Sequence, residues 1–205
     1  MNNVVSVEPI TSDFLITWNI GRRCNYDCMY CPSDVHSTKE SHKDLKQLKA
    51  IWYNILDKTN RNTYKICFTG GEVTSNKNFL PFVKWLKTSF NNKITSIILT
   101  TNGSASYEYY LELFDYVDNI SFSTHSEHIV EKKFFDTVIR LSENIGNSKF
   151  IHVNIMDEYF NEQRIDDYKS LLDKHNISNI INKIDYNKKH RDTPVFKGKL
   201  DYEFK

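Results

Sequence analysis

The sequence predicts an α/β fold with a parallel sheet, and two patterns support this. Short runs rich in β-branched and aromatic residues alternate along the chain with longer segments whose apolar residues recur at helical spacing. Two clusters that local structure does not require, a group of cysteines and a Gly-Gly-Glu triplet, each come directly after a predicted strand. Ligand sites in parallel α/β architectures gather at the carboxyl ends of the strands. We therefore expect a sheet of right-handed βαβ units with a binding site at that end.

Length and composition define the class of protein. The chain has 205 residues, of which 40% are hydrophobic, enough for one domain with a sizeable core. A formal net charge of +1 gives no field that would attract nucleic acid or an anionic membrane, and we interpret the basic cluster at 188–191 as a solvated loop. No apolar stretch approaches the ~20 residues of a membrane span, and the N-terminus does not resemble a signal peptide. We expect a cytoplasmic protein without nucleic-acid or membrane partners, where reducing conditions keep thiols free.

The first predicted strand covers residues 14–20 and follows a polar lead-in over residues 1–13. Cys24, Cys28 and Cys31 come directly after it with the spacing C-x3-C-x2-C. Three thiolates on one short loop can hold three irons of a [4Fe–4S] cluster, which takes cysteine ligands and normally needs four. The remaining iron then lacks a protein ligand and can bind a chelating molecule from outside the chain.

The cysteines have two other uses. A structural zinc site needs four ligands in a tetrahedral array, and only His36 and His42 lie near enough in sequence to contribute. A disulfide framework is disfavoured because four cysteines are few for this length and no signal peptide precedes them. The remaining cysteine, Cys67, lies between Ile66 and Phe68 and is predicted to be a buried strand residue.

A helix and a second strand follow the cysteine loop. Ser41 and Asp44 form a capping box after a polar stretch, and apolar residues then recur at helical spacing to about residue 58. The second strand, residues 64–68, leads into the Gly-Gly-Glu triplet. Adjacent glycines allow close backbone approach, and the ionised carboxylate of Glu72 can accept charge-assisted hydrogen bonds from an amine.

The alternation continues through the rest of the chain. The remaining strands are predicted over residues 94–101, 119–125, 149–156 and 177–184, and helices begin near residues 81, 107, 130 and 165. Residues 186–205 carry apolar side chains among charges, and we expect them to form a tail, one more strand or a flap over the open side.

The cysteine loop and the Gly-Gly-Glu triplet, in this order, resemble the signature elements of the radical S-adenosylmethionine (radical SAM) superfamily. The resemblance implies a partial (β/α)6 TIM-like barrel of parallel strands, open on one side, over residues 14–185. It implies a [4Fe–4S] cluster and S-adenosyl-L-methionine as cofactors, with the three cysteines of the loop as the iron ligands. Because no cysteine follows Cys67, we do not expect auxiliary clusters.

The resemblance also implies which residues bind the cofactor. An aromatic residue at the position of Tyr30 lies near the adenine in this family, and the backbone and carboxylate of Gly70, Gly71 and Glu72 meet the amino group. Ser123 and Asn154 fall on strands four and five where the family contacts ribose, methionine carboxylate or adenine. The alternative for both is that each is satisfied within the sheet.

The implied activity is reductive cleavage of S-adenosylmethionine to a 5′-deoxyadenosyl radical, which abstracts hydrogen from an organic or peptide substrate. An electron donor such as flavodoxin or ferredoxin would be a partner. His125 and Lys183, at the ends of strands four and six, are candidates for contact with substrate. Two alternatives stay open: an activating enzyme that places a glycyl radical on a partner protein, and a non-enzymatic iron–sulfur or zinc-binding module.

Overall fold

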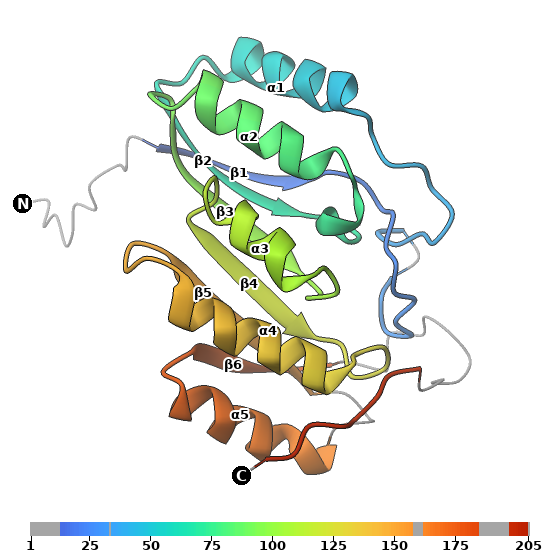
Figure 1. Ribbon diagram of the computed structural model, residues 1–205. Helices are drawn as coiled ribbons and strands as arrows, with labels where there is room; N and C mark the ends of the chain where they lie inside the picture. The colour runs from blue at the N-terminus through green and yellow to red at the C-terminus, as the bar shows by residue number, and fades with distance from the viewer. Residues whose placement is uncertain (1–12, 33, 158–161, 185–196, 205) are drawn as a thin grey trace, which may run out of the picture.

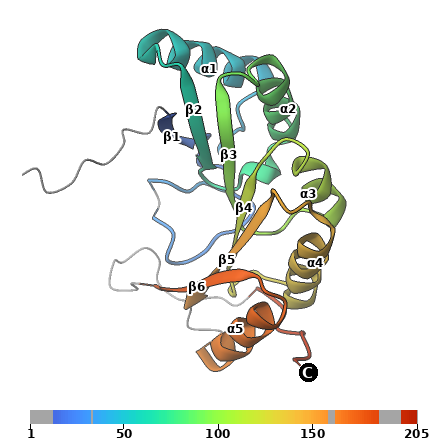
Figure 2. The ribbon, with the colours of Figure 1, turned by 90° about the vertical axis from the view of Figure 1, so that its left-hand side faces the viewer.

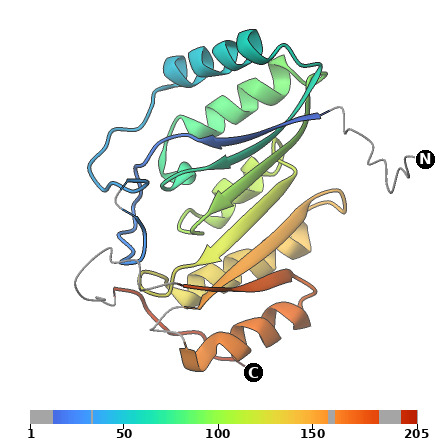
Figure 3. The same ribbon diagram turned by 180° about the vertical axis from the view of Figure 1, so that it is seen from behind.

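The computed structural model describes residues 13–32, 34–157, 162–184 and 197–204, and within them six parallel strands form one sheet in sequence order. The helices cover one face of this sheet, and the view from behind shows the strands uncovered on the other face (Figures 1 and 3). The elements are β1 (Asp13–Asn19), α1 (Leu45–Thr59), β2 (Thr63–Thr69), the 3-10 turn Val73–Ser75, α2 (Phe79–Ser89), β3 (Ile94–Thr101), α3 (Tyr107–Leu113), β4 (Asn119–Thr124), α4 (Glu131–Asn144), β5 (Phe150–Asp157), the 3-10 turn Glu162–Arg164, α5 (Ile165–Lys174) and β6 (Ser178–Lys183).

The predicted α/β fold with six parallel strands is confirmed. Each strand and helix lies within a few residues of its predicted position, because the patterns of period 2 and period 3.6 follow burial on one face of the sheet. The sheet curves around its open face, so that the loop after β1 crosses the carboxyl ends of the strands (Figure 2).

Two local predictions were wrong. The N-cap of α1 is Asp44, whose side chain accepts from the backbone of Gln47 while the Gln47 side chain accepts from the backbone of Asp44, so the capping box starts three residues later than at Ser41. Cys67 is half-buried. Because side chains alternate along β2, Ile66 and Phe68 face the helices and Cys67 faces the open side.

Aromatic side chains pack the layer between the sheet and the helices. The Trp18 ring of β1 contacts Trp52 of α1, Phe68 of β2 and Phe82 of α2, with ring centroids 5.4–6.5 Å apart. Buried aromatic rings contribute most to core energetics because of the area they remove from water. This packing fixes the carboxyl ends of β1 and β2 relative to each other, and the loops that carry the cysteines and the Gly-Gly-Glu triplet leave from those ends.

The described part of the tail, residues 197–204, packs against α4 and α5 (Figure 1). The Tyr202 and Phe204 rings lie 5.5 and 6.2 Å from the ring of Phe135 in α4. These residues thus lie on the helices and not over the open face of the sheet. The basic cluster at 188–191 and nearly all of the lead-in lie outside the described residues. Among the described helices, none is long and apolar enough to span a membrane.

Candidate cofactor-binding site

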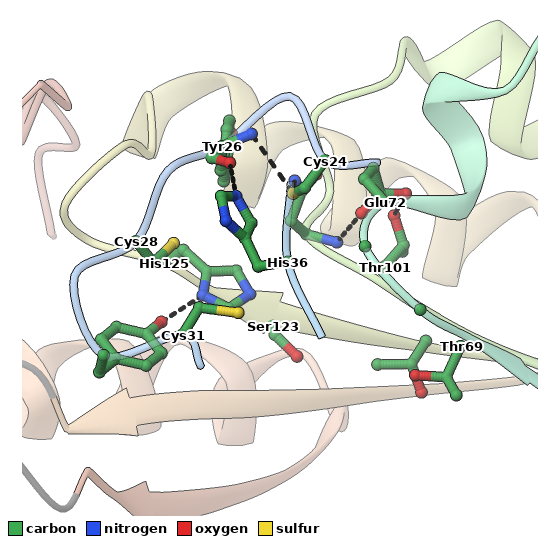
Figure 4. A pocket seen from close by; sticks show the side chains of 15 residues that line it. Cys24, Tyr26, Cys28, Cys31, His36, Thr69, Glu72, Thr101, Ser123 and His125 are labelled. Carbon is green, nitrogen blue, oxygen red and sulfur yellow. Dashed lines mark hydrogen bonds between the residues drawn. The ribbon is translucent and has the colours of Figure 1, made fainter. Parts of the chain in front are cut away.

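A cavity of about 200 Å³ lies at the carboxyl ends of β1 to β4 (Figure 4). Its walls come from four segments that are far apart in sequence: the loop after β1, the Gly-Gly-Glu loop after β2, the end of β3, and the end of β4. Cys24, Cys28 and Cys31 all line it, as the sequence predicts for three thiols that serve one site. Parallel strands bring these segments together because all their carboxyl ends lie at the same end of the sheet.

The three thiols form a donor set that suits iron. Burial raises the pKa of Cys24 to about 11, against a hydrogen bond from the backbone of Tyr26 that lowers it. Burial also raises the pKa of Cys31, with a further contribution from the Asp34 carboxylate. Without a bound cation the Cys24 and Cys31 thiols therefore hold their protons at neutral pH. Iron deprotonates a coordinating thiol, and three soft sulfur donors around one cavity fit a cluster that takes cysteine ligands.

The histidines that the sequence offered to a zinc site are used elsewhere. His36 reaches the cavity wall, but its Nε2 bonds the carbonyl oxygen of Tyr26 at 2.8 Å. His42 bonds the Ser75 hydroxyl at 3.2 Å. These bonds involve Nε2 of each ring, so a metal ion would have to bind Nδ1. His42 does not line the cavity beside the cysteines, so of the two histidines only His36 lies where it could join them.

The glycine pair is required by close approach of the backbone. A Cβ atom on Gly71 would lie 2.1 Å from the carbonyl oxygen of Arg23, and one on Gly70, whose φ is +142°, would lie 2.6 Å from the carbonyl oxygen of Gly21. The Gly71 N–H donates to Gly21 and the Glu72 N–H donates to Arg23, both at 2.8 Å. The triplet thus holds the segment that enters the cysteine loop, a role that the sequence did not indicate.

The carboxylate of Glu72 accepts four hydrogen bonds from the protein. It is buried, and the backbone and hydroxyl of Thr74 and the hydroxyl of Thr101 donate to Oε1 while the backbone of Asn102 donates to Oε2, at 2.6–2.9 Å. Burial raises its pKa, while these four hydrogen bonds favour the ionised form. Each carboxylate oxygen has about two acceptor positions, so Oε2 keeps one. The expected contact between this carboxylate and the amino group of the cofactor therefore does not require one of these donors to be displaced.

Tyr30 and His125 face the cavity together. The Tyr30 hydroxyl is hydrogen-bonded to Nδ1 of His125, and the two rings stack with centroids 6.0 Å apart. Burial, together with the nearby His128, lowers the pKa of His125 to about 4. His125 is therefore neutral at pH 7 and offers the cavity a polar but uncharged ring.

The other predicted residues divide into two groups. Ser123 lines the cavity. Asn154 does not line it, because its amide nitrogen donates to Ser121 and Ser123 at 2.8 and 3.3 Å and its amide oxygen accepts from Asn182 at 3.1 Å. Lys183, the last residue of β6, is exposed and lies outside the lining. The structure thus brings Ser123 to the site but not Asn154 or Lys183.

Sequence reasoning missed some residues of the cavity wall. Thr101 and Asn102 end β3, and the Asn102 amide donates to Asn25 of the cysteine loop at 3.0 Å. The rule that found the first two motifs, polar residues directly after a strand, also applies to Asn102. An Asn-Gly pair directly after a strand is also a common turn signal, which is why the motif alone does not indicate a site residue.

Comparisons with known proteins give a family and several relatives. Residues 18–156 match the family model described as the Radical SAM superfamily. Over 80 residues the chain is 35% identical to GTP 3′,8-cyclase of Pasteurella multocida (strain Pm70), which covers 39% of this chain and 23% of that protein. Over 91 residues it is 34% identical to GTP 3′,8-cyclase of Peptoclostridium acidaminophilum, covering 44% of this chain and 27% of that protein. The chain thus matches about a quarter of the length of these relatives.

Solved structures share the fold. Native anSMEcpe with bound AdoMet superposes with a TM-score of 0.59 at 15% identity, over 93% of this chain and 54% of that one. BtrN in complex with AdoMet and 2-DOIA superposes with a TM-score of 0.53 at 20% identity, over 73% of this chain and 58% of that one. The chain spans somewhat more than half of each.

Proposed function

We propose, from the premise that the chain belongs to the radical SAM superfamily, that Cys24, Cys28 and Cys31 hold its [4Fe–4S] cluster and that the cavity beside them receives S-adenosylmethionine. Membership identifies the chain as an enzyme with these two cofactors. The observation that supports the residue assignment is the convergence of all three thiols and the Gly-Gly-Glu loop on one cavity. When bound, the cluster supplies an electron for cleavage of S-adenosylmethionine to methionine and a 5′-deoxyadenosyl radical that removes hydrogen from substrate.

The protein's part is to bind and orient the cofactor. The amino group of S-adenosylmethionine is a hydrogen-bond donor, whereas the N–H groups of Gly71 and Glu72 already donate to the chain. We therefore assign the amino group to carbonyl oxygens of the Thr69–Gly71 segment, which lines the cavity. Glu72 acts indirectly, because its buried carboxylate ties the end of β2 to the end of β3 and so shapes this wall.

The far wall of the cavity consists of neutral polar groups. We assign Tyr30 to the adenine side, as the family resemblance implies, and Ser123 to a hydroxyl or carboxylate of the cofactor. His125, neutral and hydrogen-bonded to Tyr30, lies where a substrate that enters from the open face would meet the cofactor. We expect a small organic or peptide substrate. Flavodoxin or ferredoxin is a suitable electron donor.

Iron binding tests the assignment of the cysteines. Anaerobic reconstitution of the wild type should give one [4Fe–4S] cluster, and Cys28→Ser should lose it, as judged by iron and sulfide per chain and by EPR of the reduced protein. Cys67→Ser is the matched control and should keep the cluster, since Cys67 lies on the open face of β2 and does not line the cavity. Stoichiometric zinc in place of iron, or a full cluster in Cys28→Ser, contradicts the assignment.

A second experiment separates the two roles of Glu72. If the carboxylate shapes the wall, Glu72→Gln places an amide N–H against protein donors and should lower the free energy of unfolding by about 1–3 kcal/mol. If it also contacts the cofactor, the folded variant should in addition bind S-adenosylmethionine roughly tenfold more weakly. Denaturant unfolding of the apo-protein and titration of the reconstituted protein measure the two quantities independently.

A further inference from the structure

The loop after β4 holds the backbone on both sides of Cys28. The Asp27 N–H donates to Nε2 of His128 at 3.1 Å, and the Met29 N–H donates to Oε2 of Glu127 at 2.7 Å. These two donors flank the middle cysteine of the loop, and their acceptors are adjacent residues about a hundred positions away in sequence. Two neighbouring side chains thus hold the backbone N–H groups of the residues immediately before and after Cys28.

Burial strengthens the contact to Glu127. Glu127 is 4% exposed, the adjacent Cys28 is 5% exposed and Met29 is half-buried, so the Met29 N–H would have little access to water if it lost its acceptor. A buried donor without a partner costs the full desolvation of that group. The ring of His128 also stacks on the ring of Tyr26, with centroids 4.9 Å apart and planes 14° from parallel. The contact therefore fixes the loop by shape as well as by hydrogen bonds.

The loop after β4 is held in turn by the described tail. The Lys197 N–H donates to the carbonyl oxygen of Glu127 at 2.7 Å. A Cβ atom on Gly198 would lie 2.6 Å from the carbonyl oxygens of Ser126 and Ile129, so the tail backbone packs directly against this loop. Glu127 is thus anchored from behind while its carboxylate reaches the cysteine loop.

Two uses of this arrangement can be compared. Among the described residues, Cys28, Glu127 and His128 bring one ligand atom each to within 4.8 Å of one another, a spacing that a single metal ion could bridge. Nε2 of His128 has only one lone pair, however, and that lone pair accepts the Asp27 N–H, so Nε2 could bind a metal ion only if this bond broke. One carboxylate oxygen of Glu127 likewise accepts the Met29 N–H. These hydrogen bonds indicate that the two side chains hold the backbone of the cysteine loop and do not form a metal site.

We propose that Glu127 and His128 are positioning residues for the iron site: they fix the direction of the Cys28 thiol through the peptide groups beside it, and neither is an iron ligand. The proposal rests on the assignment of Cys28 to the cluster. Partners of metal ligands affect retention of the metal strongly, since they set ligand orientation. A thiol whose backbone is free to turn should release iron more readily.

The test compares variants of Glu127 after anaerobic reconstitution. In Glu127→Ala the rate of iron release to an excess of chelator should rise about tenfold or more, because a buried N–H loses its acceptor. Glu127→Gln keeps an amide oxygen that can accept from Met29, and should restore both the slow release and the wild-type EPR spectrum of the reduced cluster. His128→Phe keeps the ring on Tyr26 but removes the acceptor for Asp27, and should release iron faster than wild type.

The chain offers a matched control in Glu131 of α4. It is also a buried carboxylate that accepts a backbone N–H, that of Tyr202, but its partners lie on the tail and on Arg164. Glu131→Ala should lower stability yet, while folded, release iron at the wild-type rate.

Each outcome is decisive. Wild-type release from Glu127→Ala, or equal release from the two carboxylate variants Glu127→Ala and Glu131→Ala, overturns the positioning role alone. Loss of the cluster in Glu127→Gln to the same extent as in Glu127→Ala means that the carboxylate itself is needed, as for an iron ligand, and also overturns it. A wild type that assembles no cluster, or that binds zinc through Glu127 and His128, overturns the proposed function and the positioning role with it.

Discussion

Replacement of Gly71 by alanine tests the role of the glycine pair in the structure. A Cβ atom here would lie 2.1 Å from the carbonyl oxygen and 2.4 Å from the carbonyl carbon of Arg23, and 2.5 Å from the carbonyl oxygen of Arg22. All three are backbone atoms, so no side-chain rotation relieves the overlap. The chain that enters the cysteine loop must move away from the end of β2 or the variant must unfold.

The size of the effect follows from what the movement breaks. Overpacking of a close contact costs about 1–3 kcal/mol. Separation of the two segments also breaks the hydrogen bonds from Gly71 to Gly21 and from Glu72 to Arg23, each with a net value of about 0.5–1.5 kcal/mol. The free energy of unfolding should therefore fall by about 2–6 kcal/mol, a large part of the 5–15 kcal/mol typical of a domain.

Denaturant unfolding of the reduced apo-protein, followed by tryptophan fluorescence, measures this change, and Trp18 in the core next to β2 is a suitable reporter. Gly146→Ala is the control, because a Cβ atom there meets nothing within 4 Å, and its stability should stay within about 0.5 kcal/mol of wild type. If Gly71→Ala is as stable as Gly146→Ala, the close approach is not a constraint and the structural account of the triplet is refuted.

Two further predictions concern buried ionisable groups. Burial lowers the pKa of both His125 and His128 to about 4, from an ordinary value of 6.5. As the pH falls below 6.5, these histidines therefore take up protons in the unfolded chain before they do so in the folded protein. The free energy of unfolding of the apo-protein should be unaffected above pH 6.5 and should fall by up to roughly 2 kcal/mol per histidine by pH 5. Denaturant unfolding at a series of pH values measures this change. In Glu131→Ala the Arg164 guanidinium loses the carboxylate oxygen that lies 2.7 Å away. Breaking a buried ion pair costs about 3–5 kcal/mol, and the loss here should be smaller because the arginine is partly exposed. The melting temperature should fall accordingly, and an unchanged melting temperature contradicts this prediction.

The fold was predictable because its signals are local. Burial on one face imposes period 2 on strands and period 3.6 on helices, and β3 begins and ends at the predicted residues 94 and 101. The cysteine loop and the Gly-Gly-Glu triplet were also recognisable, since each is a compact motif at a strand end. Topology then brought them to one cavity without further information from the sequence.

The residues that contact these motifs were not predictable, because such contacts join distant parts of the sequence and leave no local signal. Glu127 and His128 meet the cysteine loop across about a hundred residues, and an isolated Glu-His pair after a strand has no local feature that indicates such a contact. Asn154 shows a second limit. The family resemblance indicated it as a cofactor contact, and the hydrogen bonds to Ser121 and Asn182 on the neighbouring strands agree with the alternative that it is satisfied within the sheet. A polar residue inside a strand is better evidence that its side chain lies on the open face of the sheet than that it binds a ligand.

The loop that carries the thiols depends on the rest of the sheet for its shape. Its described residues form no helix or strand between β1 and α1. Three different strand ends hold it: the Gly-Gly-Glu triplet after β2 at Gly21 and Arg23, Asn102 after β3 at Asn25, and the loop after β4 on both sides of Cys28. A small zinc module behaves in the opposite way, because there the metal organises the fold. Here the fold organises the site. The packed sheet holds the cysteine loop through hydrogen bonds between protein groups, and a rigid element of this kind can keep catalytic groups in place through a reaction.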